Sequence, residues 1–174
     1  MGTVFRIRTN FSGFSAIYNF SNSLTSFGTP RSGLVSVAGR LYGAGSTGGF
    51  YGYGGPFGID TNGTNYANLH DFSGTGTIPA DAGVPYATLL ASGNTIYGTT
   101  TANGGLGDGA LFSVNIGLGF QVLSDRLILS WGDPTFTLLS ATNVAGPYSV
   151  VSPVTNPYTN VLTGSQRYFK LQPK

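Results

Sequence analysis

The sequence predicts an all-β protein, and three observations lead to this fold class. The 174 residues include 28 glycines, two lysines and no glutamate, so the charged helix formers that helical bundles and coiled coils need are scarce. Apolar residues make up 40% and aromatic residues 13% of the chain, which excludes disorder caused by high charge and low hydrophobicity. Short strand-like runs are separated by glycine-rich turns, and many of them recur at nearly one spacing.

An internal repeat organises the first 124 residues. The matching residues lie 52 or 55 positions apart: Phe5, Phe57 and Phe112; Tyr18, Phe20 and His70, Phe72; Leu41, Tyr42, Gly43 and Ile96, Tyr97, Gly98; Gly52, Gly54 and Gly107, Gly109. The spacing changes between Phe72 and Pro85, where one copy is three residues longer. Because this stretch is polar and rich in Gly, Ser and Thr, we expect the insertion to be a loop.

Each copy of the repeat is predicted to form four short strands. In the middle copy they are Gly33–Ala38, Arg40–Ser46, Gly55–Asp60 and Tyr66–Phe72. Asn62-Gly63 favours a tight hairpin between the last two, because glycine adopts positive φ at low cost. The glycine-rich stretches Gly43–Gly54 and Gly98–Gly109 join the second strand to the third.

A four-stranded unit of about 50 residues has the size of a kelch-like propeller blade. The predicted fold is therefore two to three kelch-like blades of an incomplete propeller. A partial copy spans residues 3–20, and full copies span residues 33–72 and 87–124.

Four short motifs carry a family resemblance within residues 2–124. They are Leu41-Tyr42-Gly43, Ile96-Tyr97-Gly98-Thr99-Thr100, Asp60-Thr61-Asn62-Gly63-Thr64 and Leu69-His70-Asp71-Phe72. This set resembles the GloVer-type tandem repeat. The resemblance implies a propeller-like fold, no known reaction, and a large secreted or surface protein of environmental bacteria. Such proteins carry many more repeats, so we expect this chain to be a fragment of an extracellular or cell-surface protein, without a signal peptide of its own.

Residues 125–174 are predicted to form a separate small β module. The expected strands are Leu127–Trp131, Phe136–Ala141 and Arg167–Gln172, with prolines between them. The stretches Leu129-Ser130-Trp131 and Gln166–Leu171 are similar to a module that ends secreted proteins of the same bacterial groups. This similarity implies a fibronectin-III-like half-sandwich.

Composition also excludes several partners. The chain has no cysteine, so disulfides and cysteine-ligated metals are excluded. Its net charge is +2, and six scattered arginines do not form the basic cluster that nucleic acids need. No apolar run approaches the length of a transmembrane helix. We therefore predict no nucleic-acid partner, no membrane span and no cofactor.

Few residues are candidates for catalysis. His70 is the only histidine, and Tyr18 occupies the matching position of the first copy, which favours an aromatic-type structural position. Asp71 is adjacent, but neighbours along a strand point to opposite faces, so we expect no pair between them. Asp81 lies in the inserted loop without an evident turn role. If the chain were an enzyme, His70, Asp71 and Asp81 would be its catalytic candidates, but the sequence favours a non-enzymatic protein.

Two further patterns concern ligands. Tyr51 and Tyr53 lie in a glycine loop, where exposed aromatic rings can stack on sugars; the alternative is ordinary packing between blades. The run Asp60-Thr61-Asn62-Gly63 has some likeness to a calcium loop, but the chain has no glutamate to complete it. We therefore predict a ligand-binding role for Tyr51 and Tyr53 and no metal site.

The number of blades predicts the partners. Two and a half blades cannot close a ring of four to eight, so apolar blade faces stay open. We expect a homo-oligomer, further repeats of a longer parent chain, or cover from the C-terminal module. The predicted function is a non-enzymatic extracellular or cell-surface β-repeat protein for adhesion, assembly or scaffolding. The alternatives are a carbohydrate-binding module, for which polysaccharide would be the partner, and a polymer-acting hydrolase.

Overall fold

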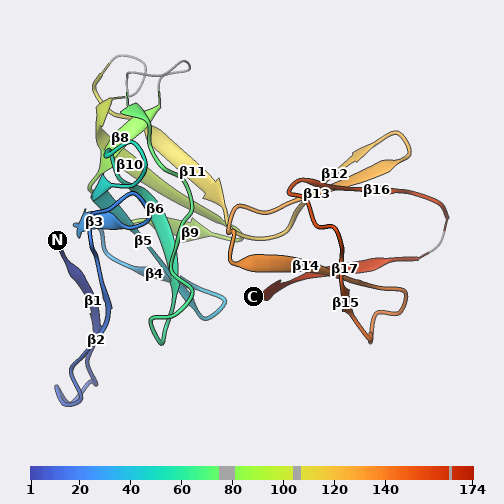
Figure 1. Cartoon of the computed structure of the whole chain (residues 1–174), viewed down its shortest axis with the longest axis horizontal. Helices are drawn as coiled ribbons and strands as arrows, with labels where there is room; N and C mark the ends of the chain where they lie inside the picture. The colour runs from blue at the N-terminus through green and yellow to red at the C-terminus, as the bar shows by residue number, and fades with distance from the viewer. Residues whose placement is uncertain (75–80, 104–106, 165) are drawn as a thin grey trace. The chain divides into compact units, whose positions relative to one another are not determined.

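The computed structural model describes residues 1–74, 81–103, 107–164 and 166–174. These residues form seventeen strands, and none of them lies in an α-helix, which confirms the all-β class. The chain divides into two compact units, Met1–Val114 and Asn115–Lys174 (Figure 1). Within the described part of the chain there is no helix of the length and apolarity needed to cross a membrane. The predicted glycine stretch Gly98–Gly109 includes residues 104–106, which lie outside the described residues.

The N-terminal unit is built from the first eleven strands. Their bounds are β1 Thr3–Arg6, β2 Ser15–Asn19, β3 Phe27–Pro30, β4 Val35–Val37, β5 Arg40–Gly48, β6 Gly55–Asp60, β7 Ala67–Asn68, β8 Ala82–Pro85, β9 Leu90–Ser92, β10 Thr95–Asn103 and β11 Leu111–Asn115. β1 and β2 form a hairpin. A second sheet has the order β3-β5-β6-β7, with β4 also paired to β5, and a third has the order β8-β10-β11, with β9 also paired to β10.

These three sheets define three segments of the chain. We call residues 3–20 the first segment, residues 27–72 the middle segment and residues 82–114 the third segment. Their strand pairs correspond at the two spacings found in the sequence. The corresponding pairs are Phe5–Ala16 and Phe57–Asn68, Pro30–Gly45 and Pro85–Thr100, and Val35–Tyr42 and Leu90–Tyr97. Both partners of each pair are therefore displaced by the same 52 or 55 residues.

Backbone conformation follows the same spacing. Thr29 and Val84 adopt φ angles of 47° and 56°, in a region that β-branched residues rarely enter. Gly54 and Gly109 also have positive φ, and a Cβ at these positions would lie 2.1 Å from the Gly45 carbonyl oxygen and 2.2 Å from the Thr100 carbonyl oxygen. Only glycine fits such a close approach between backbones.

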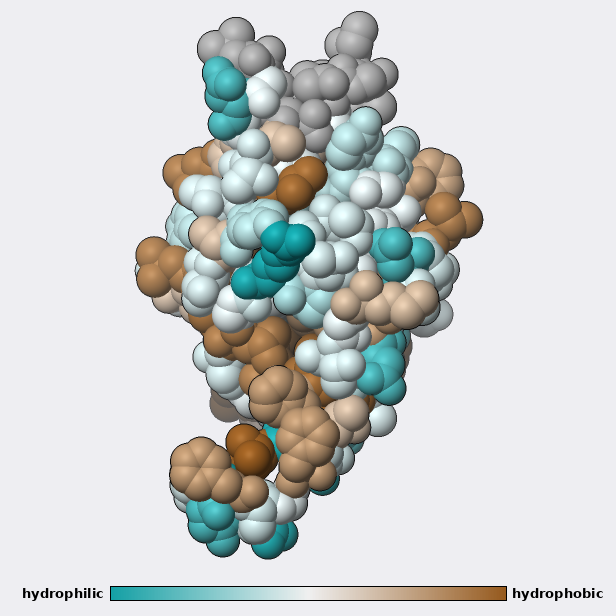
Figure 2. Space-filling view, turned by 90° about the vertical axis from the view of Figure 1, so that its left-hand side faces the viewer, coloured by the Kyte–Doolittle hydropathy of each residue, from teal (hydrophilic) through white to brown (hydrophobic). Residues whose placement is uncertain are grey.

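Aromatic contacts join the segments. Phe20, which ends the first segment, packs edge-on against Phe57 of the middle segment with ring centroids 5.1 Å apart. Phe72, which ends the middle segment, packs edge-on against Phe112 of the third segment, again at 5.1 Å. The outer side of the β1–β2 hairpin leaves apolar side chains exposed (Figure 2).

The strands of the middle segment lie close to the predicted ones. β7 is shorter than the predicted Tyr66–Phe72, but the N–H groups of Leu69 and Phe72 still donate to the carbonyl oxygens of Pro56 and Gly54. The sequence analysis missed β3 and β8, which pair with the far ends of the long strands β5 and β10.

The C-terminal unit contains six strands in two sheets. They are β12 Gly119–Leu123, β13 Arg126–Ser130, β14 Phe136–Ala141, β15 Ser149–Val150, β16 Tyr158–Val161 and β17 Tyr168–Pro173. The sheet orders are β12-β13-β16 and β15-β14-β17. Leu129, Trp131, Leu138 and Val151 form its buried core.

The boundary between the units differs in position from the predicted one. We predicted that the repeats end at Ser124, whereas the contacts divide the chain after Val114. The reason is the partner of β12, which forms a hairpin with β13 across Ser124 and Asp125. Residues 119–123 therefore belong to the sheet that contains β13.

Candidate functional site

The candidate site lies where the loop between β5 and β6 meets the chain that follows β7. Glycines with positive φ shape this loop: Gly48, Gly49, Gly52 and Gly54. The Gly54 N–H donates to the Gly48 carbonyl oxygen at 3.0 Å, which closes the loop on itself. The loop therefore presents the side chains of residues 50–53 from a backbone held at both ends.

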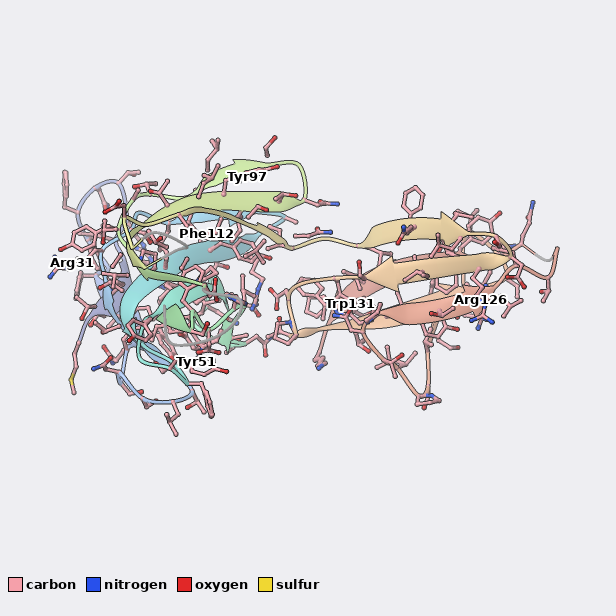
Figure 3. All side chains as sticks on the ribbon, turned by 90° about the horizontal axis from the view of Figure 1, so that it is seen from above. Arg31, Tyr51, Tyr97, Phe112, Arg126 and Trp131 are labelled. Atoms are coloured by element: carbon pink, nitrogen blue, oxygen red, sulfur yellow. The ribbon has the colours of Figure 1, made fainter. Side chains whose placement is uncertain are left out.

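Three aromatic side chains of this loop reach solvent. Phe50 is 66% exposed, Tyr51 48% and Tyr53 39%. The rings of Phe50 and Tyr51, the latter labelled in Figure 3, meet edge-to-face with centroids 4.9 Å apart. The sequence analysis selected Tyr51 and Tyr53 but missed Phe50. The signal that identifies it is the short run Phe-Tyr-Gly-Tyr, which places three aromatic residues among glycines.

Tyr53 contacts the third segment and the chain that follows the middle segment. Its carbonyl oxygen accepts a hydrogen bond from the Val84 N–H at 2.9 Å. Its ring lies against Gly74, where a Cβ would come within 2.6 Å of a ring carbon. Tyr53 is thus held in place, whereas the Tyr51 ring contacts Phe50 within the loop.

Asp71 anchors the loop. Its Oδ1 accepts hydrogen bonds from the Phe50 N–H and from Asn68 Nδ2, each at 3.0 Å. The carboxylate therefore positions the backbone that carries the exposed aromatic rings. This contact gives Asp71 a structural role in the loop.

His70 and Asp81 form the second part of the site. His70 Nε2 lies 2.7 Å from Asp81 Oδ2, and the two side chains are 50% and 30% exposed. The pair joins the chain after β7 to the residue that precedes β8. The sequence analysis named both residues but did not predict that they meet. An eleven-residue separation across an inserted loop gives no sequence signal for such a contact.

Several donors converge on the Asp81 carboxylate. Partial burial favours its neutral form, but the hydrogen bond from His70, the N–H groups of Ala82 and Ser73 and the charge of His70 outweigh this effect. The pKa of Asp81 is therefore lowered below its ordinary value. A carboxylate held ionised beside an imidazole can orient that ring, as a positioning residue does in acid–base catalysis.

A shallow hollow of about 410 Å³ adjoins the glycine loop. It is lined by Asn22, Ser23, Leu24, Thr47, Gly48, Gly49 and Gly52. Thr47 Oγ1 donates to Asn22 Oδ1 at 2.9 Å. Side-chain hydroxyl and amide groups next to exposed aromatic rings suit a ligand rich in hydroxyl groups.

The Asp60 loop is occupied by interactions of the protein itself. Asp60 pairs with the buried guanidinium of Arg40, and Asn65 Nδ2 donates to its second carboxylate oxygen at 2.8 Å. In the described part of the chain, no three His, Cys, Asp or Glu side chains lie together in a group that could hold a metal ion.

Comparison of the chain with protein-family models, with curated proteins and with solved structures finds no match. The arrangement itself offers two chemistries. One is ring stacking by Phe50, Tyr51 and Tyr53. The other is imidazole–carboxylate chemistry by His70 and Asp81.

Proposed function

We propose that the chain is a non-enzymatic β-repeat protein of the extracellular space or cell surface, which acts in adhesion, assembly or scaffolding. The observation that carries this proposal is the stacking of consecutive segments through one recurring contact. Phe20 on Phe57 and Phe72 on Phe112 have the same centroid distance of 5.1 Å. A chain built by repeated stacking of one unit is an extensible structural element. Membership of the GloVer-type repeat group stays a prediction from the sequence.

The proposed architecture is that of stacked blades with a terminal β module. The meander β4-β5-β6-β7 has the strand order of a propeller blade, which supports blade-like segments. Two three-stranded sheets that share the core of the C-terminal unit support a fibronectin-III-like half-sandwich.

Bead aggregation tests this function. Beads coated with the purified chain should clump in a manner that depends on coating density, because a scaffold or adhesin displays surfaces for its own kind or for its target. Beads coated with albumin provide the control. Coated beads that stay dispersed, and that also fail to adhere to bacterial cells, would contradict the proposal.

A second candidate, carbohydrate binding, is favoured by the exposed rings of the glycine loop. Three exposed aromatic side chains within four residues provide a platform on which sugar rings stack. Tyr51→Ala and Tyr53→Ala should each weaken retention on insoluble polysaccharides. Phe120→Ala, which removes another exposed ring in β12, is the matched control and should leave retention unchanged. If all three variants are retained as strongly as the wild type, carbohydrate binding by the glycine loop is ruled out.

A further inference from the structure

The first segment exposes residues whose counterparts in the middle segment are buried. Phe5 and Ile7 are 57% and 46% exposed, whereas Phe57 and Ile59, which lie 52 residues later, are fully buried. The first segment itself covers Phe57 and Ile59, because Val4 and Phe20 share their core cluster. We call the surface formed by Phe5 and Ile7 the first face.

The third segment shows the same difference on the opposite side. Tyr97 is 37% exposed and Leu111 76% exposed. Their counterparts 55 residues earlier, Tyr42 and Pro56, are buried. Figure 3 shows Tyr97 on the outer side of the strands of the third segment. Together with Leu90, which is 66% exposed, these residues form what we call the third face.

The two faces are the two halves of one interface. Inside the chain, Val4 of the first segment packs in one cluster with Phe57 of the middle segment. By the repeat spacing, Leu111 is the counterpart of Val4, and Phe5 is the counterpart of Phe57. A third face placed on a first face would therefore reproduce a contact that the protein already makes. The residues of both faces are uncharged, so no charge is desolvated when they meet.

We infer that the occupant of the third face is the first face of a second copy of this chain. This inference rests on the proposed function, since it extends the stacking of segments from one chain to the next. Because different surfaces meet, the association is head to tail and continues until it closes into a ring or grows as a fibre. Leu111 of one copy contacts Phe5 of the next.

Complementation between variants tests the inference on the full chain. Leu111→Asp removes the third face, and Phe5→Asp removes the first face. Wild-type protein should form oligomers that grow with concentration in sedimentation velocity runs. Each variant alone should be monomeric. An equimolar mixture should give dimers and nothing larger, because one intact face of each kind remains.

Val144→Asp is the matched control, because Val144 is 67% exposed and belongs neither to the two faces nor to the candidate site. It should oligomerise like the wild type, and unfolding midpoints should show that all three variants are folded. A monomeric wild type at high concentration, or variants that fail to complement, would overturn the inference. If beads coated with the folded Leu111→Asp variant still clump, the proposed function stands and the inference falls. If wild-type beads stay dispersed but the mixture of variants forms dimers, the inference stands and the proposed function falls.

Discussion

The middle and third segments have the same local structure but different burial. Strand pairs, backbone angles and the contacts of their glycines correspond at 55 residues, yet Tyr42 is 2% exposed and Tyr97 is 37% exposed. The middle segment packs against both other segments, through Phe20 on Phe57 and through Phe72 on Phe112. The difference teaches that local sequence determines the strand scheme and that a neighbouring segment determines burial.

The largest expected difference between the two segments concerns a phenylalanine that lies in β6 of the middle segment and in β11 of the third segment. Phe57 is fully buried and Phe112 is half-buried. Phe57→Ala should lower the free energy of unfolding by about 3–5 kcal/mol, and Phe112→Ala by about half as much, because less apolar contact is lost. Urea unfolding measures both. Equal losses would show that the neighbouring segment does not determine the burial energy.

A partly buried ion pair distinguishes the middle segment. Arg40 is 4% exposed and pairs with Asp60, whereas Thr95 and Asn115 stand at the positions 55 residues later. Asp60→Asn introduces the residue found 55 positions later and removes the Asp60 carboxylate from the Arg40 guanidinium. We expect a loss of about 1–2 kcal/mol in the free energy of unfolding, since the buried guanidinium loses a charged partner that is itself partly screened by solvent.

The double variant Arg40→Thr with Asp60→Asn carries the residues found 55 positions later at both sites and should recover part of this loss. Thermal unfolding at matched concentration checks the series. Asn115→Asp is the reverse control at an exposed position and should change stability by less than about 0.5 kcal/mol. A double variant less stable than Asp60→Asn alone would contradict this explanation.

Substitution of Gly54 and of Gly109 should lower the free energy of unfolding equally. Gly54→Ala and Gly109→Ala each place a Cβ about 2 Å from a carbonyl oxygen at positive φ. Each should be destabilising by about 1–3 kcal/mol, and by the same amount, because strain depends on local geometry and not on the neighbouring segment. Chemical unfolding of both variants compares them. A much milder effect at Gly109 would show that the two turns are not equivalent.

The smallest effect concerns the His70–Asp81 pair, which links the end of the middle segment to the start of the third. A lowered pKa in the folded state means that ionised Asp81 stabilises the fold above its unfolded pKa of about 3.8. This contribution is lost as the pH falls through the lower folded pKa. Asp81→Asn should therefore differ from the wild type by less than about 1 kcal/mol at pH 7, with the difference shrinking below pH 4. A difference that grows in acid would have the wrong sign.

Much of the N-terminal unit could be predicted from the sequence, because repeated glycines and Asn-Gly turns determine strand ends locally. β5 and β6 begin at the predicted residues Arg40 and Gly55. β3 and β8 escaped prediction, because their pairing depends on distant ends of long strands. Tyr51, Tyr53, His70, Asp71 and Asp81 were selected by residue type. The contacts of Asp71 with Phe50 and of His70 with Asp81 depend on tertiary structure, which no local pattern encodes.

Two double-mutant cycles test the central claim, that one contact joins consecutive segments, most directly. One cycle pairs Phe20→Leu with Phe57→Leu, and the other pairs Phe72→Leu with Phe112→Leu. Edge-to-face aromatic pairs contribute about 0.5–1.5 kcal/mol beyond their area, so both coupling energies should fall in this range and agree. A coupling energy near zero in either cycle would contradict the claim.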